Sequence, residues 1–388
     1  MRNFDYSIPT RIFFGEGKID VLGKELAVYG SKVLMVYGGS SIVKSGLYDV
    51  VISKLKEHGI RIWELPGVEP NPRIATVEKG IALCREHGID AVLAVGGGST
   101  IDCAKVVAAG CHNENDAWTL VKKPKKIGTV LPIATVLTLA ATGTEMDQFA
   151  VISNPEINEK IGTGHPAMFP KFSILDPTYT FSVPASQTAA GTVDIMSHVM
   201  EVYFSNPKEA FLPDRMSESL LLTCIRYGKK AMEEPNDYEA RANLMWASSL
   251  AINGLLSYGK EQKNWCVHPI EHELSAYYDI THGVGLGIII PVWLDYILDA
   301  STVEKFVEYG VNVWGIEKGE DAMAIAKESI RMTRSFFDSL GIPNTLSAVG
   351  IDETHFEAMA TGSVRNGEIG GIKRLNKEDV LNLLKRAL

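Results

Sequence analysis

The segment from Ala91 to Asp102 places a short apolar run directly before a glycine-rich turn and a helical pattern. The run AVLAV is apolar throughout, which is typical of a strand that is buried on both faces of a sheet. Strand-like and helix-like segments alternate in the same way along the first half of the chain. This order predicts a Rossmann-like α/β fold, a parallel sheet covered by helices. The further strands that we expect are KVLMVYGG (32–39), RIWEL (61–65), TVLPIA (129–134) and FSILDP (172–177).

The chain changes character near Val183 and Pro184. Before this point, FAVISNPEINEKIGTGH (149–165) predicts two short strands around an Asn-Pro turn. After it, strand-like alternation nearly vanishes and long amphipathic segments predict helices, the last of them in NKEDVLNLLKRAL at the C-terminus. Because 388 residues exceed one typical core, we expect an α/β domain over residues 1–183 and an all-helical domain over residues 184–388.

Charge, cysteine content and hydropathy argue against several classes of protein. The 38 basic and 47 acidic residues give a net charge of −9, so the chain has no general attraction to nucleic acid or anionic membranes. The five cysteines form no CxxC pair, and the N-terminus lacks the apolar core of a signal peptide. The longest apolar run starts at Val284 and is broken by Pro291 and Asp295, which predicts a buried helix or helix pair. We therefore expect a cytoplasmic protein.

Four of the nine histidines fall between Asp194 and His282. Asp194 and His198 are four residues apart, so they project from one face of a helix. A carboxylate with several imidazoles suits a borderline divalent metal such as Zn²⁺ or Fe²⁺. Any one of these histidines alone is better explained as an ordinary surface or core residue, but the set predicts a metal site. The spacing does not choose between His268 and His272, which lie one helical turn apart.

Three turns rich in glycine or hydroxyl groups follow predicted strands. GGGSTID (96–102) opens a helix, whose N-terminal N–H groups suit a pyrophosphate, and Ser99 can cap that helix or bind the phosphate. GGSS (38–41) repeats this arrangement, and LTLAATGTE (137–145) can line a cofactor face. The two glycine-rich turns do not match GxGxxG, and the alternative is a tight connection with no ligand. Because residues 38–40 are Gly-Gly-Ser without an acidic group, they leave room for a 2′-phosphate and favour NADP over NAD.

Seven segments, taken in order, make the whole chain resemble the metal-dependent (iron-type, group III) alcohol dehydrogenase family. They are FFGEG, VYGGSS, GVEPNPR, AVGGGSTIDCAK, LTLAATGTEM, AGTVDIMSHVMEVYF and HPIEHELSAYYDITHGVGLGIIIP. Within that family the chain looks most like the branch of butanol dehydrogenases and broad-range NADPH-dependent aldehyde reductases. The resemblance implies a dehydroquinate synthase-like architecture, with an N-terminal dinucleotide-binding domain, an all-helical metal-binding domain and a metal in the cleft between them.

The resemblance also implies roles for individual residues. Asp194, His198, His268 and His282 match the metal ligands, which leaves His272 nearby as the candidate catalytic proton relay. Lys160, taken alone, would be interpreted as a solvated charge in a polar turn. The positions that match binding residues for NADP(H) are Gly38, Gly39, Ser40, Asn71, Gly97, Gly98, Ser99, Asp102, Thr138, Thr142 and Lys160.

From these observations we expect an NADP(H)-linked alcohol dehydrogenase or aldehyde reductase with one divalent metal, Fe²⁺ or Zn²⁺. The expected substrates are short-chain aliphatic alcohols and aldehydes of the butanol and butanal kind. Phe149 falls where some polyol-handling relatives place a polar residue, which predicts a preference for aldehydes without hydroxyl groups. The resemblance further implies a homodimer, and we expect no nucleic-acid or membrane partner.

Three alternatives stay open at this point. One is a polyol (glycerol-type) dehydrogenase, and another is a dehydroquinate-synthase-like lyase. Such a lyase needs clustered lysines and arginines for a phosphate- and carboxylate-bearing substrate, whereas the histidine window offers only Lys260 and Lys263, beside Trp265, Tyr277 and Tyr278. A metal-storing or ligand-binding protein would keep the histidines but would have no use for the three turns.

Overall fold

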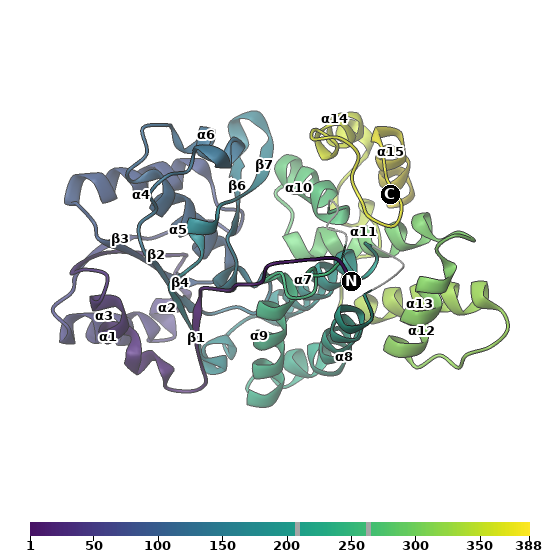
Figure 1. The fold of residues 1–388 in the computed structure, drawn as a ribbon, viewed down its shortest axis with the longest axis horizontal. Coiled ribbons are helices and arrows are strands. Elements are labelled where there is room, and N and C mark those ends of the chain that lie inside the picture. The colour runs from purple at the N-terminus through teal and green to yellow at the C-terminus, as the bar shows by residue number, and fades with distance from the viewer. Residues whose placement is uncertain (206–209, 261–264) are drawn as a thin grey trace. The chain divides into compact units, whose positions relative to one another are not determined.

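The structure, a computed structural model, describes residues 1–205, 210–260 and 265–388. The chain divides into two compact units (Figure 1). The sheet unit contains Ser7–Val183 and Pro235–Ser249, and the helical unit contains Met1–Tyr6, Pro184–Glu234 and Leu250–Leu388.

These units differ from the predicted domains, 1–183 and 184–388, in two segments. Met1–Tyr6 clusters with the helical unit, and Pro235–Ser249 clusters with the sheet unit. Sequence patterns could not assign either segment, because a local pattern does not state which core a segment packs against. A domain boundary near Pro184 stays a proposal.

Six strands form the central sheet of the sheet unit: β1 (Arg11–Phe14), β2 (Lys32–Tyr37), β3 (Arg61–Leu65), β4 (Ala91–Gly96), β5 (Ile133–Leu137) and β8 (Phe172–Leu175). Their order is β1-β8-β5-β4-β2-β3, and every neighbouring pair is parallel. Parallel neighbours need crossover connections, which the intervening helices supply. This topology confirms the predicted α/β sheet.

Helices cover both faces of this sheet (Figure 1). One layer holds α1 (Leu22–Ala27), α2 (Ser41–Lys44) and α3 (Leu47–Glu57), and the other holds α4 (Ile74–His87), α5 (Gly98–Gly110) and α6 (Ala117–Lys122). Met35 and Leu93 share a core with the first layer, whereas their neighbours Val36 and Ala94 share a core with the second. Successive strand residues therefore point to opposite layers, and each buried large apolar side chain contributes roughly 1.5–3 kcal/mol.

A separate antiparallel hairpin, β6 (Phe149–Asn154) and β7 (Glu159–Gly164), packs against α5 and α6. It confirms the two short strands predicted within residues 149–165. Asn158, with φ at 48°, makes the left-handed turn that enters β7. Asparagine tolerates this conformation better than most residues because its side chain can form local hydrogen bonds.

The strand predicted at residues 129–134 was misplaced, since β5 occupies Ile133–Leu137. Pro132 has no N–H to donate to the ladder, so only its carbonyl takes part, accepting from Val92 N at 2.9 Å. Leu137, expected in a turn, is therefore the last residue of the strand. The four-residue strand β1, at the edge of the sheet, was not predicted.

The helical unit is built around α7 (Ala185–Tyr203), which packs against α8 (Phe211–Glu233) and α11 (His282–Ile297). The apolar run from Val284 lies in α11, which continues through Pro291 as one helix. A capping box of Asn376 and Asp379 starts the predicted last helix, α15 (Lys377–Arg386). Among the described residues, no helix is long and apolar enough to cross a membrane. The other helices of the C-terminal half are α9 (Tyr238–Ile252), α10 (Val267–Tyr278), α12 (Val303–Trp314), α13 (Ala322–Ser339) and α14 (Phe356–Ser363).

Candidate metal centre and dinucleotide-binding turns

Three helices of the helical unit bring four predicted metal ligands together. Asp194 and His198 lie on α7, His268 lies in the first turn of α10, and His282 begins α11. Asp194 Oδ1 lies 3.5 Å from His198 Nδ1 and 3.7 Å from the Nε2 atoms of both His268 and His282. The i, i+4 spacing on α7 accounts for the first contact, and the packing of α10 and α11 supplies the other two.

The contacts of these side chains fit a divalent cation. Asp194 Oδ1, His198 Nδ1 and His268 Nε2 are buried, and none of them has a hydrogen-bond partner among the described residues. Asp194, His268 and His282 each offer a ligand atom, all within 4.8 Å of one another. Ligand atoms at about 2.1 Å from a tetrahedral Zn²⁺ lie roughly 3.4 Å apart, close to the separations from Asp194. Buried polar atoms without partners are rare, and a cation would satisfy these.

His198 stands slightly apart from the other three. It is not part of that mutually close set, but its ring stacks on the ring of His268 with the centroids 4.5 Å apart. Its Nδ1 atom lies 3.5 Å from Asp194 Oδ1. The structure therefore groups Asp194, His268 and His282 tightly and places His198 against them.

Charge and burial set the protonation of this cluster. Burial raises the pKa of Asp194, but His198, His268 and His282 outweigh that effect and bring it down to about 2. Burial lowers the pKa of His198 to about 3. Burial also lowers the pKa of His268, but Glu201 and Asp194 raise it to about 9. Asp194 is therefore an anion and His198 is neutral at pH 7, the forms in which these side chains bind metals.

Two glutamates at this site were not predicted from the sequence. Glu201, on α7, makes a short hydrogen bond to His268 Nδ1, and Glu271, on α10, makes a short hydrogen bond to His282 Nδ1. Glu201 lies three residues beyond His198 on the same helix, a spacing that could have been noticed. Nothing in the sequence indicates that its partner would be a histidine from another helix.

His272, the candidate proton relay, is half-buried on α10 beside the cluster. Its ring centroid lies 6.3 Å from that of His268 and 5.8 Å from that of His282. His272, Glu271 and His282 also form a second group whose ligand atoms lie within 4.8 Å. His272 is thus close to His268 and His282, but it is not in the group that contains Asp194.

In the sheet unit, the turn between β4 and α5 contacts the turn after β5. Gly97 is the N-cap of α5 and Gly98 is its first residue. A Cβ at Gly98 would lie 2.4 Å from Thr142 Oγ1, and Thr138 N donates to Gly96 O at 3.0 Å. Glycine is needed at Gly98 because the second turn approaches so closely. The structure therefore brings Gly97, Gly98, Thr138 and Thr142 together at the carboxyl ends of β4 and β5.

The turn after β2 lies next to this pair. A Cβ at Gly38 would lie 3.7 Å from Thr100 Oγ1 of α5, an ordinary contact, and Gly39 has no neighbour within 4 Å of such an atom. Gly39 and Ser40 are exposed, while Asn71 is buried. The candidates near a 2′-phosphate are therefore accessible.

The remaining dinucleotide candidates have structural partners. Ser99 Oγ makes a short hydrogen bond to Pro70 O. Asp102 accepts from Thr144 Oγ1 at 2.7 Å and from Val151 N at 2.8 Å, and burial raises its pKa to about 6. Asp102 thus ties α5 to the hairpin. Lys160 is buried on β7 opposite Ser153, so it is not the solvated charge that its local sequence alone would indicate.

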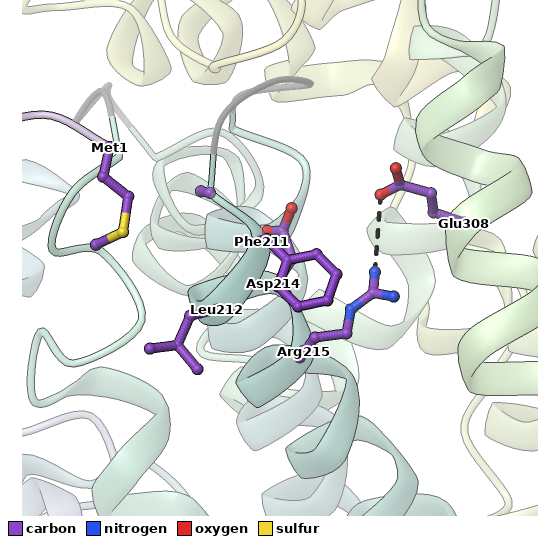
Figure 2. Close-up of a pocket in the computed structure, with 7 residues that line it drawn as sticks. Met1, Phe211, Leu212, Asp214, Arg215 and Glu308 are labelled. Carbon is purple, nitrogen blue, oxygen red and sulfur yellow. Dashed lines mark ion pairs between the residues drawn. The ribbon is translucent and has the colours of Figure 1, made fainter.

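The pocket in Figure 2 is separate from the candidate metal centre. Met1, Phe211, Leu212, Asp214, Arg215 and Glu308 line it, and it includes none of the candidate ligands. Arg215 points toward Glu308, with a nitrogen–oxygen distance of 3.9 Å, and also pairs with Glu218 at 2.6 Å. The charged groups of this pocket are thus paired within the chain.

Lys260, the basic residue of the histidine window that the structure describes, is not free to bind an anion. Lys260 is buried, and its Nζ lies 2.6 Å from Asp214 Oδ1. Lys263 lies outside the described residues. This arrangement gives no support to a lyase that grips a phosphate and a carboxylate.

Comparison with known proteins agrees with the site. Residues 9–177 match the family described as iron-containing alcohol dehydrogenase, and residues 188–388 match the C-terminal part of the Fe-containing alcohol dehydrogenase family. The chain belongs to the iron-containing alcohol dehydrogenase family. The resemblance inferred from the sequence motifs is confirmed, and membership implies a divalent metal and a nicotinamide cofactor.

Relatives match over nearly the whole chain. NADH-dependent butanol dehydrogenase A from Clostridium acetobutylicum is 61% identical, with 100% of each chain covered. NADPH-dependent aldehyde reductase YqhD from Escherichia coli is 39% identical, with 92% of each chain covered. The crystal structure of NADH-dependent butanol dehydrogenase A from Thermotoga maritima superposes with a TM-score of 0.95 at 38% identity, covering 100% of this chain and 99% of the other. These matches identify the chain as an alcohol dehydrogenase or aldehyde reductase.

Proposed function

We propose that this enzyme catalyses reversible hydride transfer between NADP(H) and short-chain aliphatic aldehydes such as butanal, with a divalent metal at Asp194. The observation that carries the proposal is the buried cluster of Asp194, His198 and His268, whose facing atoms have no hydrogen-bond partner among the described residues. His282 completes the candidate ligand set. Two relatives are named for butanol dehydrogenase and aldehyde reductase activity, which supports this substrate class.

The proposed roles follow from the chemistry of each group. Asp194, His198, His268 and His282 would hold the cation, which when bound supplies Lewis-acid polarisation of the carbonyl oxygen. Asp194, as an anion, reduces the net charge of that site. His272, half-buried and next to the cluster, would donate the proton to the alkoxide formed by hydride transfer.

The dinucleotide is proposed to bind along the turns after β2, β4 and β5. The first turn of α5 points backbone N–H groups away from the helix, where a pyrophosphate fits. The absence of an acidic residue at Gly38, Gly39 and Ser40, together with their accessibility, supports acceptance of the 2′-phosphate of NADP(H). Because the relative from C. acetobutylicum is named as NADH-dependent, both dinucleotides belong in the assay.

Substrate preference is proposed to depend on Phe149. Its side chain is 48% exposed at the start of β6, and its ring lies over Gly164, where an added Cβ would come within 2.3 Å of it. An aromatic surface of this kind favours an alkyl chain over a hydroxylated one. We also propose a cytoplasmic location and a homodimeric assembly.

One experiment tests the proposal as a whole. Purified protein is analysed for bound metals and assayed with NADPH and NADH against butanal, glyceraldehyde and other aldehydes. The proposal expects one divalent metal per chain, iron or zinc, and oxidation of NADPH with butanal. A preparation with bound metal but no dinucleotide oxidation on any aldehyde would instead support a storage protein or a lyase.

A further inference from the structure

We infer that Glu201 and Glu271 are positioning residues that fix the rings of His268 and His282, so that the Nε2 atoms of both face the metal. The inference rests on the proposed function, because it concerns the same metal. Neither glutamate is one of the four proposed ligands, although Glu271 also belongs to the second close group with His272 and His282. Both glutamates approach the histidines from the side opposite Asp194: each bonds an Nδ1 atom, whereas Asp194 lies near the Nε2 atoms.

The chemistry of the two pairs decides the tautomers. An ionised carboxylate only accepts hydrogen bonds, so the Nδ1 atoms of His268 and His282 carry the hydrogens. The cation then takes the place of any proton on Nε2, the ring atom that lies 3.7 Å from Asp194 Oδ1 in both histidines. A ring held in this way cannot turn its N–H toward the cation. Such carboxylate–histidine pairs orient metal-binding histidines and make them more basic.

Glu201 has a second task. The N-cap of α10, Cys266, offers no capping side chain, so the first N–H groups of this helix need another partner. The carboxylate of Glu201, from α7, accepts from Val267 N at 3.0 Å and from His268 N at 3.1 Å, besides His268 Nδ1 and Cys266 N. Glu201 thus caps α10 and orients the histidine in its first turn with one carboxylate.

Glu271 orients the ring of His282. It is fully buried, one oxygen accepts from His282 Nδ1, and the other accepts from Ser275 Oγ. Ser275 Oγ also lies 3.2 Å from Ile280 O, so the hydroxyl can donate there when Glu271 is replaced by glutamine. Glu271→Gln therefore removes the charge and leaves the packing intact. Glu201→Gln, by contrast, turns an amide N–H₂ toward groups that are themselves donors.

Glu273 provides a matched control on the same helix. It is buried like Glu271, and its carboxylate pairs with Arg365 and packs against Gly362. Glu273→Gln removes a buried negative charge two residues from Glu271, at a carboxylate that pairs with Arg365. A general effect of buried charge on metal affinity would appear in this variant too.

The test measures metal affinity separately from stability. Metal-loaded full-length protein is titrated with a chromophoric chelator, with Zn²⁺ and with Co²⁺, and thermal unfolding is followed in excess chelator. We expect Glu271→Gln to weaken metal binding on the order of 10- to 100-fold with no change in the chelator-treated midpoint. Glu201→Gln should weaken binding at least as much and also lower that midpoint, whereas Glu273→Gln should keep the wild-type affinity.

The outcomes distinguish failure of the proposed function from failure of the inference about Glu201 and Glu271. Wild-type protein that binds neither ion would overturn the proposed function and this inference with it. Wild-type protein that binds metal, together with Glu201→Gln and Glu271→Gln variants of equal affinity, would overturn this inference alone. It would also be overturned if Glu273→Gln lost as much affinity as Glu271→Gln.

Discussion

Asp147 in the sheet unit and Asp194 in the helical unit are both buried carboxylates, but their surroundings differ. Asp147 Oδ1 lies 2.7 Å from Lys105 Nζ, which also bonds Thr144 Oγ1 at 2.7 Å. Asp194 Oδ1 faces three imidazoles and has no hydrogen-bond partner within the part of the chain that the structure describes. A buried charge needs a partner. The first cluster carries its own cation, and we propose that the second receives one from solution.

The largest expected effect comes from removing the anion of the second cluster. Asp194→Ala should abolish both bound metal and aldehyde reduction. The variant loses the one negatively charged ligand, and the three remaining histidines alone should bind the cation too weakly to retain it. Metal analysis and an assay with butanal and NADPH measure this, and circular dichroism verifies the fold. Activity that persists in a metal-free variant would refute the role proposed for the metal.

Removing the internal cation of the first cluster should act on stability instead. Lys105→Met leaves Asp147 buried and unpaired, which we expect to lower the free energy of unfolding by roughly 3–5 kcal/mol. Metal content per folded molecule should stay at the wild-type level. Lys32→Met serves as the control, since the Lys32 ammonium makes one partly exposed bond to His87 O and its loss should change stability by about 0.5 kcal/mol or less. Equal free energies of unfolding for the two variants would contradict the idea that Lys105 is the internal cation on which Asp147 depends.

Glu145, next to the first cluster, predicts a pH dependence. Burial raises its pKa from 4.5 to about 7, although the hydrogen bond from Ser249 lowers it. The folded state therefore holds this proton more tightly than the unfolded state does, and that stability is complete below about pH 4.5 and lost as the pH rises through about 7. Glu145→Gln cannot ionise, so its stability relative to wild type should rise by up to roughly 3 kcal/mol between pH 4.5 and pH 8. Urea unfolding at both pH values measures this, and a constant difference would contradict it.

The smallest effect concerns the substrate. Phe149→Asn should lower the ratio of butanal to glyceraldehyde turnover by roughly 10-fold, the size of a modest apolar contact. Ile157→Asn is the control, because Ile157 is 51% exposed in the turn of the same hairpin. An unchanged ratio in Phe149→Asn would show that this ring does not select the substrate.

Local patterns were enough to predict much of the fold. The strand at Ala91–Gly96 is an apolar run followed by glycines, and the strand at Arg61–Leu65 is a short segment between Gly59 and Pro66. Such signals depend on neighbouring residues alone. The edge strand β1 was missed because four residues give too short a pattern. The assignment of residues 235–249 to the sheet unit depends on contacts with distant segments, which periodicity does not describe.

The candidate site was predictable to the same extent. The i, i+4 spacing placed Asp194 and His198 on one helix face, and the structure shows them in contact. The spacing could not separate His268 from His272, since that depends on how α10 packs; in the structure it is the Nε2 of His268 that lies near Asp194. Glu201 and Glu271 escaped notice because each acts on a residue whose position only the tertiary fold determines.

The membership of Pro235–Ser249 in the sheet unit has a consequence for biosynthesis. When Val183 leaves the ribosome, every strand of the six-stranded sheet has been made, but Ser249, which bonds Glu145, and Trp246, whose ring lies 6.0 Å from that of Phe14, have not. Glu145 and Phe14 therefore lack these partners in the nascent chain while α7 and α8 are translated. Maturation of the N-terminal half is thereby linked to the synthesis of a segment that lies well inside the C-terminal half.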